Sequence, residues 1–413
     1  MTKEIIIKSI FIILFIIATY VAEIFYRDPL YDNSIEIAKT LQGKLPFLIT
    51  PLKIYSTLGI LDFLWVFIIF LFFPINYCFT FFLNVAVSVH ICNYMKLLYG
   101  QGRPFLINGT GKDILKACEA GYGNPSGHSF QSTSNFLALA QIIIDFFKLK
   151  MKSSIFIYIV VAILILLINF SRVILGVHSI NQIIFGDTLG FCIYFIFFQI
   201  IKPYKIDIDN FLGKFLNIRY HIINAILFIV VLTYILMGAI YLEREEENSV
   251  LKTRLELYCG VNENQMLTRN SIIKSFYIMS YFGMICGLTA FTIILKNRYN
   301  YNFNAANYYY RNIDMKWYKK YGIRFLIVLL CFIPYPVTFL RPKYINKYLV
   351  YVFCSALPMF LFGFFLFGLS FLANILLKVA NKEIYSIKSS NTLTEYNINL
   401  NLNEDEEDSP YLY

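Results

Sequence analysis

Long apolar stretches separated by short polar connections occupy most of the chain. A helix needs about 20 residues to cross a hydrocarbon core of about 30 Å, and about ten stretches come close to that length. Apolar and polar residues do not alternate along them as in strands, and lipid leaves no partner for free backbone amides, so we expect helices. The predicted fold is an all-α integral membrane protein with about ten transmembrane helices. The predicted spans are 5–26, 57–73, 76–95, 126–146, 153–171, 181–201, 217–241, 271–295, 322–340 and 348–378.

Composition supports a membrane protein, because 58% of the 413 residues are hydrophobic and only 15% are charged. An ordinary soluble domain carries about 25% charged residues. We divide the chain into a six-helix core at 1–201, an additional four-helix transmembrane region at 202–379 and a tail at 380–413. The tail is polar and acidic, which predicts a disordered cytosolic segment.

The net charge of +10 comes mostly from Lys and Arg residues between apolar stretches. Because these residues do not cluster on one solvated face, they indicate membrane topology, and no nucleic-acid partner is expected. The positive-inside rule places the loops near 148–152, 202–219 and 296–320 in the cytosol, together with both termini. The glycosylation sequon at 108–110 then lies in the lumen.

The eight cysteines show no spacing typical of metal ligands, so no metal site is expected. Cys118 and Cys259 lie in loops predicted on the same, lumenal side, so a disulfide could join them.

Three polar clusters lie at helix ends on the predicted lumenal side, where ionisable groups are costly and usually functional. The first joins Lys96 and Arg103, which are seven residues apart and so share a helix face, where they would present two cations to an anion. The alternative is that both side chains only extend to the interface. The other two clusters are Asn124-Pro125-Ser126-Gly127-His128 and the segment from Ser171-Arg172 to His178.

The second cluster begins a predicted helix, with Ser126 and Gly127 in its first turn and His128 beside them. A helix N-terminus attracts phosphate oxygens through its free amides, although a capped helix with an interfacial histidine would have the same sequence. In the third cluster Gly176 permits a sharp bend that could return His178 toward Arg172.

The order, spacing and shared side of the clusters are similar to the signature of the type 2 phosphatidic acid phosphatase superfamily, which is related to vanadium-dependent haloperoxidases. That signature runs KxxxxxxRP, PSGH and SRxxxxxHxxxD, and this chain reads KLLYGQGRP, PSGH and SRVILGVHSINQ within residues 55–200. The resemblance implies a phosphoric monoester hydrolase that uses no metal and no cofactor.

The resemblance also implies a role for each residue. Phosphate oxygens would be bound by Lys96, Arg103 and Arg172, assisted by Ser126 and the Gly127 amide. His178 would attack phosphorus to give a phosphohistidine, and His128 would protonate the leaving alkoxide.

One position departs from the signature, because Gln182 stands where the family usually has an Asp four residues after the nucleophile. Glucose-6-phosphatases of the same superfamily similarly carry Gln there. Asp62 is the one acid in the second apolar stretch, and we expect it to approach His178 and supply the missing charge. The alternative is a helix-packing Asp bonded to a neighbouring hydroxyl or amide.

For substrate, the chain length, the extra C-terminal helices and Gly176-Val-His178-Ser179 are similar to sphingosine-1-phosphate phosphatases of internal membranes. This resemblance favours a lipid phosphate, either a sphingoid-base phosphate or phosphatidate. It also favours an enzyme of the endoplasmic reticulum or another endomembrane with a lumenal active site. The alternatives are a sugar phosphatase of the glucose-6-phosphatase type and a non-catalytic transporter or scaffold, against which the complete motif set argues.

Overall fold

The computed structural model describes residues 3–73, 75–107, 119, 121–201, 245–260, 283–284, 286–287, 290, 316–339 and 352–376. Its described elements are helices, and no strand occurs among these residues, which confirms the predicted all-α class. The predicted spans 217–241 and 271–295 lie wholly or mostly outside the described residues, as do the sequon at 108–110 and the tail at 380–413.

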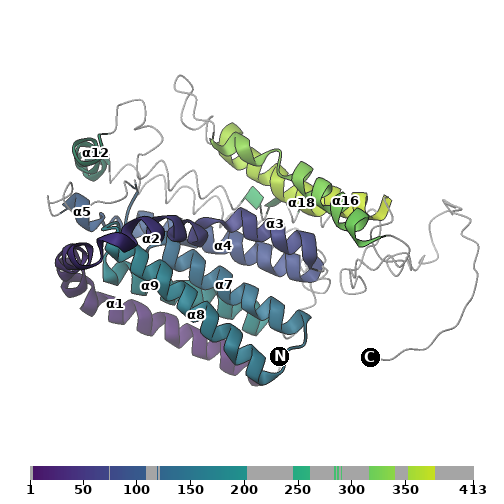
Figure 1. Cartoon of the computed structure of the whole chain (residues 1–413), viewed down its shortest axis with the longest axis horizontal. Helices are drawn as coiled ribbons and strands as arrows, with labels where there is room; N and C mark the ends of the chain where they lie inside the picture. The colour runs from purple at the N-terminus through teal and green to yellow at the C-terminus, as the bar shows by residue number, and fades with distance from the viewer. Residues whose placement is uncertain are drawn as a thin grey trace, which may run out of the picture.

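The N-terminal half forms a bundle of long helices (Figure 1). Its helices are α1 (Lys3–Lys44), α2 (Ile49–Ser56), α3 (Asp62–Phe72), α4 (Ile75–Tyr99), α5 (Pro104–Ile107), α7 (Gly127–Phe146), α8 (Met151–Ile174) and α9 (Ile180–Tyr194). A 3₁₀ turn at Thr57–Ile60 links α2 to α3, and a π-helical segment, Phe195–Ile201, continues α9.

Four helical segments of the described chain are long and apolar enough to cross a membrane, namely Lys3–Lys44, Tyr77–Ile107, Met151–Ile174 and Ile180–Ile200. The bent pair Pro46–Gly59 and Asp62–Phe72 adds a fifth if it counts as one span. The chain is therefore an integral membrane protein, while the predicted number of about ten helices remains a prediction.

Helix α7 is the central helix of the bundle, and it packs against α4, α8 and α9. Its buried face includes Ser129, Ser132, Thr133, Ser134 and Asn135, which its neighbours shield from lipid. Shielding by protein explains how a helix this polar can lie within a membrane bundle.

Small residues allow α9 to approach α7 closely. Gly186 and Gly190 are four residues apart, and a Cβ on Gly186 would lie 2.8 Å from the carbonyl oxygen of Ser126. A Cβ on Gly190 would collide with the carbonyl oxygen of Phe130. Small residues at this spacing are typical of membrane helix pairs whose backbones touch, and here they bring the middle of α9 against the start of α7.

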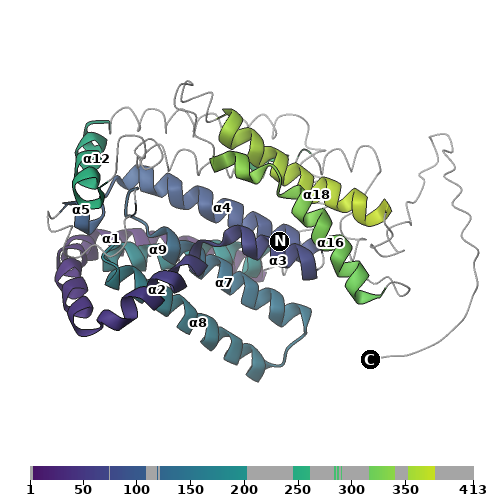
Figure 2. The ribbon, with the colours of Figure 1, turned by 45° about the horizontal axis from the view of Figure 1, so that its top comes forward.

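Helix α1 is much longer than the predicted span 5–26, because it continues past Pro29 to Lys44. This continuation turns across one end of the bundle, as the two views show (Figures 1 and 2). Its buried polar side chains bind loop and helix ends there. Ser34 Oγ accepts a hydrogen bond from the Ile180 amide at 2.9 Å, and Gln42 Nε2 donates to the Ile174 carbonyl at 2.6 Å. The apolar span ends near residue 26, but the helix continues as a polar segment that caps the end of the bundle.

The C-terminal half contributes three longer described helices, α12 (Glu245–Cys259), α16 (Trp317–Cys331) and α18 (Leu357–Leu376). Helices α16 and α18 lie side by side near α3 (Figures 1 and 2). The buried Arg324 of α16 donates to the Phe70 carbonyl at 2.8 Å and so satisfies an end of α3.

Helix α12 lies at the other end of the molecule, next to α5 (Figure 1). Arg254 donates to the carbonyls of Leu106 and Ile107, at 2.7 Å and 2.9 Å. Cys259 is disulfide-bonded, and Cys118, the partner that the sequence suggested, lies outside the described residues.

Candidate active site

The structure brings the three polar clusters together at the end of the bundle that the continuation of α1 crosses. There α4 ends and α7 begins, and α8 ends six residues before α9 begins. The turn between α8 and α9 includes Gly176, whose φ of 72° suits glycine, so the chain reverses as the sequence predicted.

The two arginines are buried, with 2% of Arg103 and 1% of Arg172 exposed. Backbone carbonyls hold Arg103, which donates to Gly121 and to Val177 at 3.0 Å each. Arg172 donates to Ser56 Oγ at 3.4 Å. Because the end of α2 and the loops around α5 and His178 hold these side chains, both guanidinium groups have fixed positions before any ligand arrives.

Both guanidinium groups bind the carboxylate of Glu119. Its Oε2 lies 3.1 Å from Arg103 Nη1, and its Oε1 is paired with Arg172 Nη2. Burial alone would raise the pKa of Glu119, but Arg172 and Arg103 hold that pKa well below its usual range. The site therefore already holds a two-oxygen anion, which is the geometry in which guanidinium groups also bind phosphate.

Lys96 reaches the start of α7. Its Nζ lies 3.3 Å from the place that a Cβ on Gly127 would occupy, so any side chain at Gly127 would crowd it. Ser126 caps α7, with its Oγ 3.5 Å from the Ser129 amide and 3.0 Å from Ser129 Oγ. A lysine beside a helix N-terminus adds a third positive element to the site.

The two histidines face the same carboxylate. One nitrogen of His128, one nitrogen of His178 and one oxygen of Glu119 lie within 4.8 Å of one another. His178 is 2% exposed and His128 is 9% exposed, so both rings are largely removed from water. An anion in the place of Glu119 would therefore contact two imidazoles as well as two guanidinium groups.

Gln182 fixes the tautomer of His178. The Gln182 Nε2 donates to the Gly102 carbonyl at 3.1 Å, and the Oε1 accepts from the Ser179 amide at 3.3 Å. These backbone groups fix which end of the amide is oxygen, and that oxygen lies 3.1 Å from His178 Nδ1. Since an amide oxygen only accepts, Nδ1 carries the proton and the lone pair is on Nε2, 3.1 Å from Arg103 Nη1.

His178 lies in the connection between α8 and α9, outside both spans. Burial, followed by the charges of Arg103 and Arg172, lowers its pKa well below the ordinary value. A lowered pKa keeps the imidazole neutral near pH 7, and only the neutral ring has a free lone pair.

Asp62 does not approach His178 as the sequence predicted. Its Oδ1 accepts from Asn135 Nδ2 at 2.7 Å, and Asn135 in turn accepts from Asn84 at 3.0 Å. Asn135 lies seven residues after His128 along α7, about 10 Å deeper in the bundle. Asp62 is therefore a packing residue bonded to an amide, and the partner of His178 is Gln182.

The same three residues, Glu119, His128 and His178, offer ligand types that could also hold a metal ion. Their surroundings do not suit one, because Arg103 and Arg172 already bind the carboxylate and would repel a cation placed there. The charges of the site therefore fit an anion better than a cation.

Comparisons with known proteins identify the same region. Residues 73–205 match the family model described as the PAP2 superfamily. Phosphatidylglycerophosphatase B of Bacillus subtilis (strain 168) is 28% identical over 96 residues, which make up 23% of this chain and 45% of that relative. The match thus spans less than half the length of this curated relative.

Among solved structures, a transmembrane PAP2-type phosphatidylglycerolphosphate phosphatase from Bacillus subtilis aligns over 50% of this chain and 98% of its own length. The TM-score is 0.37 and the sequence identity is 19%.

The matched residues include the whole set that the structure gathers around one anion-binding point, from Lys96 and Arg103 through Ser126, Gly127 and His128 to Arg172 and His178. The family model thus confirms the predicted resemblance to the PAP2 superfamily, over residues 73–205 of the chain.

Proposed function

We propose that the chain is a membrane phosphatase that hydrolyses a phosphate monoester, and that its substrate is a lipid phosphate such as phosphatidate or a sphingoid-base phosphate. The observation that carries the proposal is the convergence of Arg103 and Arg172 on one carboxylate beside two histidines. Phosphoryl transfer needs mainly positioning and neutralised equatorial oxygens, and fixed cations can supply both.

In the proposed binding step the substrate phosphate displaces Glu119 and takes its place between the two arginines. Lys96 and the N-terminal amides of α7 then contact the remaining oxygens. The displaced carboxylate is 23% exposed at its side chain, so it has a route toward solvent.

In the proposed first chemical step the Nε2 lone pair of His178 attacks phosphorus, and the bond from phosphorus to the ester oxygen breaks. His128 is protonated once the negatively charged phosphate is bound beside it, and it gives this proton to the departing alkoxide. The Nδ1 proton of His178 stays on the hydrogen bond to Gln182. The product is a phosphohistidine on Nε2 and a free alcohol.

In the proposed second step water attacks phosphorus and the bond between phosphorus and nitrogen breaks. His128, now neutral, takes the proton of that water. Inorganic phosphate leaves, and His178 regains its neutral form with the lone pair on Nε2.

Two observations support a lipid phosphate. The site lies at the ends of helices that can cross a bilayer, so a phosphate at the membrane surface would be at its level. The curated relative is named for a lipid phosphate, although the match spans only part of it. The positive-inside pattern supports a site on the non-cytosolic side. The resemblance to sphingosine-1-phosphate phosphatases supports an endomembrane such as the endoplasmic reticulum, where that side is the lumen.

One observation favours the alternative of a sugar phosphate. A cavity of about 520 Å³ is lined by Gly102, the residue before Arg103, and by polar residues that include Arg27, Asp28, Tyr31 and Gln101. A polar leaving group could use such donors and acceptors. The substrate panel in the first prediction below separates the two possibilities.

The first prediction concerns substrate class and metal dependence. Purified full-length protein should release phosphate from phosphatidate and sphingosine 1-phosphate in EDTA, and vanadate should inhibit it, because protein cations bind the phosphate. The measurement is inorganic phosphate release over a panel that also contains glucose 6-phosphate. Loss of activity in EDTA that Mg²⁺ restores would contradict the mechanism, and a preference for glucose 6-phosphate would favour the alternative substrate.

The second prediction concerns Glu119. Glu119→Gln removes the charge that competes with a bound oxyanion, so vanadate should inhibit this variant at a roughly tenfold lower concentration, about 1.4 kcal/mol. Inhibition constants measured with a soluble aryl phosphate provide the comparison. Glu36→Gln is the matched control, because it removes the same charge from the exposed surface of α1. Unchanged or weaker vanadate inhibition of Glu119→Gln would show that Glu119 does not occupy the phosphate position.

The third prediction separates Gln182 from Asp62. Gln182→Met removes the acceptor of the His178 Nδ1 proton and should lower kcat roughly 100-fold, since the correct tautomer is then no longer held. Gln182→Glu keeps an acceptor and should retain much more activity than Gln182→Met. Asp62→Asn should keep most of its turnover in the same assay, because Asp62 does not contact the histidine. The reverse order, with Asp62→Asn more damaging than Gln182→Met, would restore Asp62 to the catalytic set.

A further inference from the structure

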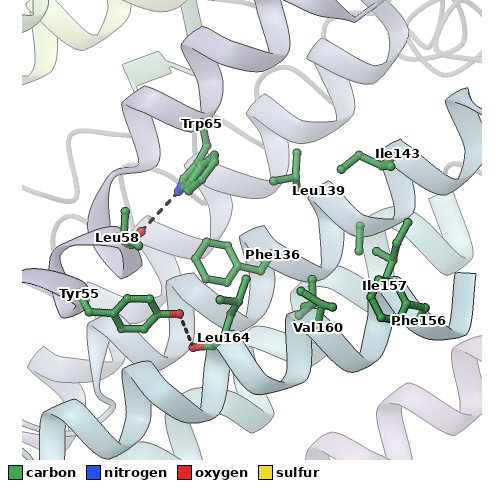
Figure 3. Close-up of a pocket in the computed structure, with 12 residues that line it drawn as sticks. Tyr55, Leu58, Trp65, Phe136, Leu139, Ile143, Phe156, Ile157, Val160 and Leu164 are labelled. Carbon is green, nitrogen blue, oxygen red and sulfur yellow. Dashed lines mark hydrogen bonds between the residues drawn. The ribbon is translucent and has the colours of Figure 1, made fainter. Parts of the chain in front are cut away.

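An apolar groove is bordered by helix α7, by helix α8 and by the 3₁₀ turn that precedes α3 (Figure 3). We propose that this groove holds one hydrocarbon chain of the lipid phosphate while its phosphate group lies between Arg103 and Arg172. The proposal rests on the proposed function and adds to it a binding site for the chain.

The groove has a volume of about 310 Å³, and its lining is apolar and aromatic. The two polar groups of its wall are already used, because Tyr55 donates to the Leu164 carbonyl at 3.2 Å and Trp65 donates to the Leu58 carbonyl at 3.4 Å. This volume equals about ten water molecules, which would find no hydrogen-bonding partners there. The groove therefore suits hydrocarbon.

One wall of the groove is formed by the segment 55–59, which also contacts the phosphate-binding residues. Ser56, between the lining residues Tyr55 and Leu58, accepts a hydrogen bond from Arg172 at 3.4 Å. A Cβ on Gly59 would lie 3.4 Å from the carbonyl oxygen of His128. One short segment thus contacts the site on one side and the groove on the other.

The position of the groove along the bundle also fits a hydrocarbon chain of the substrate. On α7, Phe136 lies eight residues from His128, and on α8, Leu164 lies eight residues from Arg172, so both walls begin about 12 Å from the site. The far lining residues, Ile143 and Phe156, lie about 22–24 Å from it. The groove therefore runs along α7 and α8, away from the site. An acyl chain likewise runs along the membrane normal, away from its head group.

The outer side of the groove is exposed on the surface of the bundle. Phe156 and Val160 are 66% and 38% exposed, while Ala140 behind them is 1% exposed. A chain could therefore enter sideways from the bilayer while its head group reaches the arginines. The hydrocarbon chain of the substrate would move from the apolar bilayer into an apolar groove. The groove would therefore act by aligning the substrate more than by adding affinity.

The experiment fills the groove and compares two substrates. Val160→Trp places a large ring in it, and Ile163→Trp is the matched control, since Ile163 is 52% exposed on the same helix and does not line the groove. We expect Val160→Trp to lower kcat/KM about tenfold for dioleoyl phosphatidate and to leave para-nitrophenyl phosphate within about twofold. Ile163→Trp should change neither. Equal loss on both substrates, no loss on either, or the same selective loss in Ile163→Trp would overturn the proposal.

The wild-type protein separates this inference from the function on which it rests. Hydrolysis of para-nitrophenyl phosphate without hydrolysis of any lipid phosphate would overturn the proposed substrate and the groove together. Hydrolysis of both, with the variants unselective, would overturn the groove alone.

A second measurement does not depend on a folded variant. Wild-type protein is illuminated with phosphatidate that carries a diazirine in one chain, and labelled peptides are mapped with and without vanadate. We expect labels within 136–164 that decrease when vanadate occupies the phosphate site. Labels there that vanadate does not change would identify an ordinary bilayer lipid as the occupant.

Discussion

Two guanidinium groups buried beside each other need an anion, and the rest of the site follows from this need. Removing an ion from water costs several kcal/mol even after relaxation, and two neighbouring cations repel. In the structure Arg103 and Arg172 are compensated by the carboxylate of Glu119 and by carbonyl oxygens around Arg103. In the proposed reaction cycle a phosphate replaces the carboxylate, so the cations meet a suitable anion in both states.

The helix ends around this cation pair are held by side chains remote from it in the sequence. The continuation of α1 binds the end of α8 and the start of α9 through Gln42 and Ser34. Glu23 of the same helix accepts a hydrogen bond from Asn124, next to the start of α7, at 3.1 Å. Because these contacts join different helices, the geometry of the site depends on the whole bundle, as positioning within about 1 Å requires.

Much of the fold and site could be predicted from the sequence. The apolar stretches gave six core helices close to α1, α3, α4, α7, α8 and α9, because lipid requires nearly uninterrupted apolar helices. Motif spacing gave the two histidines and the three cations, since their chemical types are unusual at helix ends in a membrane.

Other features depended on tertiary contacts that no local pattern encodes. Glu119 was not singled out, because a single acid in a loop has no periodicity, although its place just before the second motif was a signal. The role of Gln182 depended on two backbone neighbours that fix its amide. Asp62 was predicted at the site because it is the one acid in its apolar stretch, but its side chain bonds to Asn135 instead.

In the proposed mechanism His178 attacks phosphorus through Nε2 while Gln182 holds the proton on Nδ1. The most direct measurement uses ³²P-labelled para-nitrophenyl phosphate, a good leaving group, with the His128→Ala variant, in which loss of the general base should slow release of the intermediate. Acid-labile label should accumulate on His178, and the isomer identified after digestion should be the one phosphorylated at Nε2. Label on another residue or on Nδ1 of His178, or nitrophenolate release without any covalent label, would contradict this mechanism.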